Sequence, residues 1–173
     1  LDIIIPDEYI VPLPTVVTSN NSQVIDDKSD KKSIIWIGRL VDFKLPSFFA
    51  MLEFINENKD YSLTIVGNGE IDKVDKYIKQ NNIDCSKIYF KGEMAYSELG
   101  EEISKHSIGY ATGTSIIEIT QRGLPVIMAL LNYKHKNFKR QICGGLFSNT
   151  SKGNIGEDLM FLDEDSVKST IKD

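Results

Sequence analysis

The segment of this chain with the most chemical content is GTSIIEITQRGLPVI, residues 113–127. Its order of residues predicts a glycine turn at Gly113, a helix that opens on Thr114 and Ser115, a glycine stop and an apolar strand. The first backbone N–H groups of a helix lack partners within it and carry a partial positive charge, which predicts a seat for a phosphate group. Glu118, about one turn further on, offers a carboxylate that accepts hydrogen bonds from sugar hydroxyls. Together these features predict a nucleotide-sugar site.

Glu118 has a second interpretation. Ser115 and Glu118 have the spacing of a capping box, in which the glutamate side chain accepts a hydrogen bond from the backbone N–H of the capping serine. Such boxes are frequent at ordinary helix starts. The two roles of Glu118, ligand binding and capping, therefore stand as alternatives at this point.

A basic pair follows another apolar run. In the segment GRLVDFK, residues 38–44, Arg39 offers a planar fork of donors and Lys44 a mobile point charge. Such a pair can neutralise a diphosphate. The alternative is two solvated loop cations, because charged residues are common in loops.

The segment VGNGE, residues 66–70, predicts a tight turn after a strand. Its compactness allows a ligand to approach the backbone at Gly67 and Asn68. A dinucleotide-binding fingerprint would require a third glycine where Asp72 stands, so that motif is not matched. The alternative is a turn that two glycines merely relieve of steric conflict.

Composition limits the classes of partner. A net charge of −5 and a pI near 5.1 argue against nucleic acid, since binding to a phosphate backbone needs an excess of basic residues on one face. Cys85 and Cys143 lie far apart without a CxxC motif, which fits a reducing cytoplasm and predicts neither a disulfide nor a zinc framework. His106 and His135 have no acidic or cysteine partner at metal-binding spacing, so we expect no metal site.

The run Lys134–Arg140 is the one dense basic segment, and it contains Phe138. It is a candidate contact with an anionic acceptor or a membrane surface, with a solvated loop as the alternative. No segment reaches the roughly 18 to 20 apolar residues of a membrane span. We therefore expect a cytoplasmic protein, with this run as the candidate peripheral contact with the inner face of the membrane.

These motifs need elements to position them, and the chain supplies an alternating pattern. Short apolar runs predict strands buried on both faces, at 33–37, 61–66, 87–90, 108–111 and 124–128. Helical periods lie between them; their apolar positions are Phe48, Met51, Leu52 and Ile55 after Pro46, then Ile71, Val74 and Ile78, then Tyr96, Leu99 and Ile103.

Five βα units in this order predict an α/β fold, a Rossmann-like, doubly wound parallel sheet flanked by helices, with ligands beyond the carboxyl ends of its strands. The length of 173 residues fits one such domain. We expect residues 1–32, which contain three prolines and a polar run, to form an N-terminal segment and linker, and residues 33–173 to form the domain. The chain begins at Leu1, and we expect it to be part of a longer protein.

The ordered set of motifs resembles a known family. Ile37–Leu40 with Lys44, then Leu63–Glu70, Ile88–Gly92 and Gly113–Val126 are similar to the C-terminal domain of GT-B glycosyltransferases of the glycosyl transferases group 1 (family 4) type. The resemblance extends over about residues 33–147. It implies one half of a GT-B fold that binds a nucleotide-sugar donor, with retaining chemistry and usually no metal or other cofactor.

The resemblance also implies roles for single residues. Arg39 and Lys44, next to Gly38, match the catalytic basic pair on the donor diphosphate, and Gly67 with Asn68 matches the turn near the nucleotide. The helix start, Gly113 with Thr114, Ser115 and Ile116, matches the segment that supports the phosphates.

Glu118 matches the second glutamate of the family's E-x7-E motif, which binds the ribose. Tyr110 stands where the first glutamate of that motif would be, so the usual contact with the donor sugar is missing.

The implied partners are a nucleotide-sugar donor, a glycan or lipid-linked acceptor and an N-terminal acceptor-binding domain that these residues do not include. Family resemblance favours surface polysaccharide biosynthesis. Two alternatives remain open, a GT-B sugar-nucleotide epimerase, which needs no acceptor, and a non-catalytic flavodoxin-like binding module.

Overall fold

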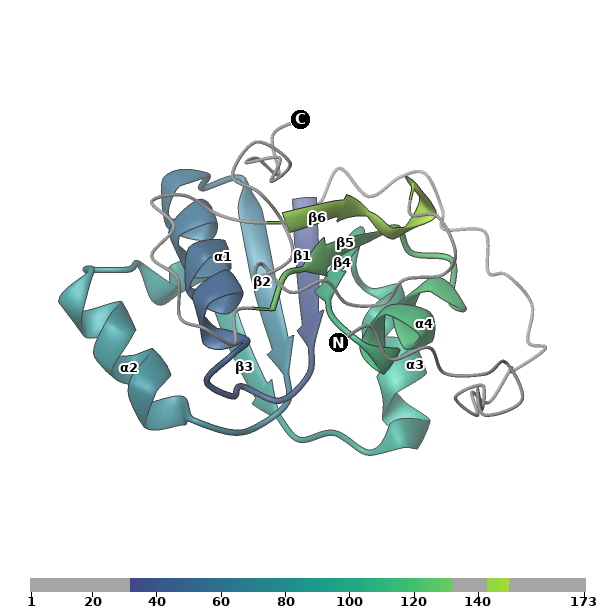
Figure 1. Cartoon of the computed structure of the whole chain (residues 1–173), viewed down its shortest axis with the longest axis horizontal. Helices are drawn as coiled ribbons and strands as arrows, with labels where there is room; N and C mark the ends of the chain where they lie inside the picture. Colours follow the sequence, from purple (N-terminus) through teal and green to yellow (C-terminus); the bar gives the residue numbers. More distant parts are fainter. Residues whose placement is uncertain (1–31, 132–142, 150–173) are drawn as a thin grey trace, which may run out of the picture.

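The computed structural model describes residues 32–131 and 143–149 (Figure 1). Its elements in chain order are β1 (Lys32–Ile37), α1 (Leu45–Glu57), β2 (Tyr61–Val66), α2 (Ile71–Gln80), η2 (Cys85–Lys87), β3 (Ile88–Gly92), α3 (Tyr96–Ser104), β4 (Ile108–Ala111), α4 (Thr114–Thr120), β5 (Val126–Ala129), β6 (Cys143–Leu146) and η3 (Phe147–Asn149). The predictions for the N-terminal segment and linker, for His135 and for the basic run Lys134–Arg140 lie outside the described residues.

The strands form one six-stranded sheet in the order β3-β2-β1-β4-β5-β6. The pairs among β1 to β5 are parallel, and β6 pairs antiparallel with β5. This arrangement confirms the predicted α/β Rossmann-like fold. The described residues contain four of the five predicted βα units, followed by β5; residues 132–142, where a helix after β5 would begin, lie outside the described part of the chain.

The helices cover both faces of the sheet, with α1 and α2 on one side and α3 and α4 on the other (Figure 1). The predicted apolar face of α1 is buried, from Phe48 to Ile55, and Pro46 lies in its first turn. This face forms one core with Ile34, Trp36 and the α2 residue Val74. A second core forms between the other sheet face and the helices α3 and α4.

Two predictions about burial were wrong. β3 is an edge strand, so Tyr89 and Phe90 are largely exposed instead of buried on both faces. Tyr96 was expected on the apolar face of its helix, yet it is 54% exposed while Leu99 and Ile103 are buried. As the first residue of α3, Tyr96 extends past the edge of the core that the next turns cover.

Strand register sets where the loops begin. Ile37, the last residue of β1, pairs with Val66 of β2 and with Ala111 of β4. The loops after three neighbouring strands therefore start at one level, which is the carboxyl end where ligands of such sheets bind. Among the described residues, no helix combines the length and the apolar character that crossing a membrane requires.

Candidate functional site

The loops after β1 and β2 are joined backbone to backbone. The N–H of Leu40 donates to the carbonyl of Asn68 at 2.9 Å, and the N–H of Glu70 donates to the carbonyl of Leu40 at 2.8 Å. The N–H of Gly38 donates to the carbonyl of Val66 at 3.0 Å. Since backbone hydrogen bonds hold both loops, the residues they carry have fixed positions relative to one another.

Gly67 is required by this contact. A Cβ atom on Gly67 would lie 2.1 Å from the carbonyl oxygen of Gly38, and the φ angle of Gly67 is +143°. The side chain of Asn68 turns back within its own loop, where its Oδ1 accepts a hydrogen bond from the N–H of Gly69 at 2.8 Å. The close approach of the two loops is a sufficient reason for the glycine at position 67. A nucleotide contact at Gly67 and Asn68 stays a prediction.

Lys44 and Ser115 come together at Gly38, although they are far apart in the sequence. A Cβ atom placed on Gly38 would lie 3.7 Å from the Nζ of Lys44 and 3.9 Å from the Oγ of Ser115. The carbonyl of Gly38 is held by the indole N–H of Trp36 at 3.1 Å. The first loop and the start of α4 therefore form one site, as the positions after parallel strands predicted.

This site carries unbalanced positive charge. Within the described part of the chain, neither Arg39 nor Lys44 has an ion pair or a side-chain hydrogen bond, whereas nearby Lys73 is paired with Asp42 and Glu70. Burial lowers the pKa of Lys44 below its ordinary value, and the adjacent Arg39 charge lowers it further. Two neighbouring cations without a counterion form an arrangement that an anion would stabilise.

The start of α4 adds donors. Gly113 precedes the helix with φ +67°, and no atom lies within 4 Å of the place where its Cβ would be. The N–H of Ile116 already donates to the carbonyl of Gly113 at 3.0 Å, and the Ile116 side chain is fully buried in the core. Among the described residues this leaves the N–H groups of Thr114 and Ser115 without a protein partner.

The capping role of Glu118 is excluded. The capping position before α4 is held by Gly113, which has no side chain, so Ser115 is the second residue of the helix and not its cap. Instead, one carboxylate oxygen of Glu118 pairs with Nη1 of Arg122, and the other accepts a hydrogen bond from the Tyr96 hydroxyl at 3.0 Å. The Glu118 side chain is 19% exposed, so part of its carboxylate surface remains open to solvent.

Tyr110 belongs to the core. Its side chain is fully buried beside Trp36, and its hydroxyl donates to the backbone carbonyl of Ser47 at 3.1 Å. The position that would hold the first motif glutamate thus secures α1 to the sheet.

Comparison with known proteins identifies structures with a similar fold. No family model and no curated protein matches the sequence. Among solved structures, the lipopolysaccharide outer core galactosyltransferase WaaB in its apo form matches with a TM-score of 0.51 at 15% identity, over 66% of this chain and 34% of that one. The chain has a glycosyltransferase-like fold.

Two further glycosyltransferase structures match with lower TM-scores. A mutant of S. aureus TarM in complex with fondaparinux, alpha-GlcNAc-glycerol and UDP has a TM-score of 0.47 at 22% identity, over 57% of this chain and 21% of that one. The pneumococcal O-GlcNAc transferase GtfA in complex with UDP and GlcNAc has a TM-score of 0.47 at 24% identity, over 56% and 20%. The chain thus spans about a third or less of each matched protein.

Within this glycosyltransferase-like fold, sequence reasoning missed the two partners of Glu118. Arg122 follows Glu118 by four residues, a spacing that places oppositely charged side chains together on a helix and could have indicated the pair. Tyr96 left no comparable signal, because its contact with Glu118 joins residues 22 positions apart on different helices.

Proposed function

We propose that this chain is the nucleotide-sugar donor-binding domain of a retaining glycosyltransferase. The enzyme transfers a sugar from a nucleoside diphosphate to a glycan or lipid-linked acceptor, in the cytoplasm and in surface polysaccharide biosynthesis. Because the chain spans about a third or less of the glycosyltransferases it matches, the acceptor site in this proposal belongs to another domain.

One observation carries the proposal. Among the described residues, Arg39 and Lys44 have no counterion at the carboxyl end of the sheet, and the Nζ of Lys44 and the hydroxyl of Ser115 both lie close to Gly38. Lys44 is half-buried, while Arg39 beside it is exposed. A half-buried cation without a partner is costly unless a ligand supplies the missing negative charge. A diphosphate has the charge and the several acceptor oxygens to match this set of donors.

The same cations would act in the reaction. As the bond between the sugar and the diphosphate breaks, negative charge builds up on the leaving oxygen. Arg39 and Lys44 then stabilise the transition state more than the ground state, which is the condition for a faster chemical step. The N–H groups of Thr114 and Ser115 would also stabilise the negative charge on the leaving diphosphate. Glu118 would accept hydrogen bonds from the ribose hydroxyls.

Binding of nucleotides tests this function directly. Calorimetric titration with UDP, GDP, ADP and CMP should show binding of at least one nucleotide, and Arg39→Ala should weaken that binding about tenfold or more through loss of charge-assisted hydrogen bonds.

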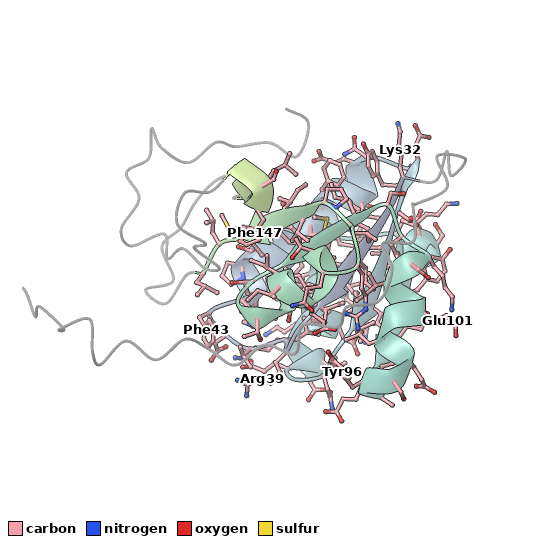
Figure 2. All side chains as sticks on the ribbon, turned by 90° about the vertical axis from the view of Figure 1, so that its right-hand side faces the viewer. Lys32, Arg39, Phe43, Tyr96, Glu101 and Phe147 are labelled. Atoms are coloured by element: carbon pink, nitrogen blue, oxygen red, sulfur yellow. The ribbon has the colours of Figure 1, made fainter. Side chains whose placement is uncertain are left out.

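Lys32→Ala is the matched control, because Lys32 lies at the opposite end of β1 from Arg39 and pairs with Asp60 (Figure 2). This control should leave the affinity unchanged. Absence of binding at millimolar nucleotide, or equal effects of the two alanine variants, would contradict the proposed function.

A further inference from the structure

The carboxylate of Glu118 is held from two helices. Its two oxygens are engaged by Arg122, which lies in the turn just after α4, and by the hydroxyl of Tyr96 at the start of α3. Arg122 and Glu118 are both 19% exposed, whereas Tyr96 is 54% exposed. A largely exposed aromatic residue therefore contacts a carboxylate that is mostly enclosed.

The Arg122 guanidinium is itself fixed in place. Nη1 also donates to the backbone carbonyl of Glu118 at 2.8 Å, and the guanidinium lies 5.9 Å from the centre of the Tyr96 ring. On its other side it packs on α3, where a Cβ atom on Gly100 would lie 3.1 Å from Nε. Because these contacts come from both helices, the guanidinium has little freedom to swing away from Glu118.

The Glu118 carboxylate keeps free acceptor capacity. A carboxylate offers about four acceptor positions, and Arg122 with Tyr96 uses two of them. Two positions remain, which matches the two neighbouring hydroxyls of a ribose. Tyr96 lies at the same end of the molecule as Arg39, opposite Lys32 (Figure 2).

We propose that Tyr96 and Arg122 are positioning residues, which hold the Glu118 carboxylate in one orientation so that it selects ribonucleotides over deoxyribonucleotides. The inference rests on the proposed function and adds a specificity device to it. A free glutamate side chain would lose its rotamer freedom when the ligand binds. In this protein Arg122 and Tyr96 impose that order beforehand, which favours binding.

A purely structural role for the cluster makes a different prediction. If Tyr96 and Arg122 only join α3 to α4, their removal lowers thermal stability and weakens all nucleotides equally. If they position Glu118, their removal weakens the ribonucleotide more than its 2′-deoxy form, because the 2′-deoxy form can use the oriented carboxylate only through its 3′-hydroxyl. The ratio of the two affinities therefore separates the two roles.

The experiment uses the full chain and the nucleoside diphosphate that binds most tightly among UDP, GDP and ADP. Calorimetry measures its affinity and that of its 2′-deoxy form for the wild type and for Tyr96→Phe, Arg122→Lys and Glu118→Gln. We expect the wild type to prefer the ribonucleotide about tenfold, and each variant to lose most of that preference. Tyr89→Phe, an exposed tyrosine on the edge strand β3, is the matched control and should keep it.

The outcomes are distinguishable. A wild-type protein that binds ribonucleotide and deoxyribonucleotide equally, or a Tyr96→Phe variant that retains the full preference, overturns this inference and leaves the proposed function intact. A wild-type protein that binds no nucleoside diphosphate overturns both. Thermal unfolding of every variant shows whether it is folded, and Tyr96→Phe, which removes only an oxygen from an exposed ring, keeps the test valid if Arg122→Lys does not fold.

Discussion

Lys44 and Lys73 show how position decides the role of the same side chain. Lys73 lies on the surface of α2 between two carboxylates, which raise its pKa through hydrogen bonds and charge attraction. Lys44 is half-buried, has no carboxylate partner in the described part of the chain and faces Arg39, so its pKa is lowered. Of these two lysines, only Lys44 would gain from binding an anion.

The lowered pKa of Lys44 gives a pH prediction. A bound diphosphate would raise that pKa again, so binding favours the protonated lysine, and the affinity should fall as the pH rises through the lowered value, which lies below 10.5. For folding in the absence of ligand, the effect of pH has the opposite sign, and the free energy of unfolding increases as the pH rises. The charged Lys44 opposes folding, and this cost is relieved as the pH rises through the same value.

Titration of nucleotide affinity from neutral to alkaline pH measures the effect on binding. The control is Lys44→Arg, which stays charged over this range and should show a flatter profile. Because the ligand titrates identically in both series, the difference between the two profiles reports Lys44. Identical profiles would show that Lys44 does not face the bound anion.

Residue identity indicated which positions lie together, and their role as a binding site stays a prediction. The sequence placed Gly38, Lys44 and Ser115 at strand ends, and the structure brings them together. It left Glu118 with two interpretations, because capping and ligand binding use the same residue types at the same spacing. Only the contacts with Arg122 and Tyr96 excluded capping.

At the scale of elements, the joined loops after β1 and β2 are the feature that holds the site in shape. Gly67 makes this contact possible, since its missing side chain leaves room for the carbonyl of Gly38. The residue that follows that carbonyl is Arg39. Any displacement of the turn at Gly67 is therefore transmitted to the predicted diphosphate contact.

Gly67→Ala should both destabilise the protein and weaken nucleotide binding. The new methyl group would meet the Gly38 carbonyl at 2.1 Å and force an unfavourable φ angle, which together cost about 3 kcal/mol or more in the free energy of unfolding. Denaturant titration and calorimetry measure the two effects.

Gly123→Ala is the control for the φ angle alone. Gly123 has φ +85°, and no atom lies within 4 Å of its Cβ position, so we expect a cost of about 1 to 2 kcal/mol. A Gly67→Ala variant no less stable than Gly123→Ala would mean that the two loops separate easily.

At the scale of the whole molecule, the described residues form a six-stranded sheet with the candidate site at its carboxyl edge. The matched part of this chain covers 34% of WaaB and 21% and 20% of the other two glycosyltransferases. In our proposal the leaving diphosphate is stabilised here, and the acceptor is bound elsewhere. Binding of the donor and turnover should therefore be separable.

We expect the isolated chain to bind a nucleotide sugar but to show little or no transferase activity. Coexpression or fusion with the acceptor-binding domain should restore activity, because that domain brings the acceptor to the sugar. Release of nucleoside diphosphate, measured with and without acceptor, follows turnover. Full turnover by the isolated chain would refute the division of labour between two domains.

The sequence by itself determined the class of fold and the edge of the sheet where the candidate site lies. Apolar runs at 61–66 and 108–111 coincide with β2 and β4, because buried parallel strands require continuous apolar residues. It did not predict β6, whose segment Cys143–Leu146 holds two glycines and which pairs with β5 beyond a stretch of intervening residues. A local sequence pattern reports only on neighbouring residues. Pairing between strands that are distant in the sequence depends on the tertiary structure.

Only the tertiary structure decided which side chains meet. Tyr110 lies in the core because its strand turns it toward α1, and Tyr96 reaches Glu118 because α3 and α4 cover the same face of the sheet. Within the described residues Lys44 has no ion pair, and it is half-buried close to Gly38 and Ser115, which depends on how separate segments pack. Charge, burial and contact depend on distance in space, and for these residues that distance is set by the packed sheet.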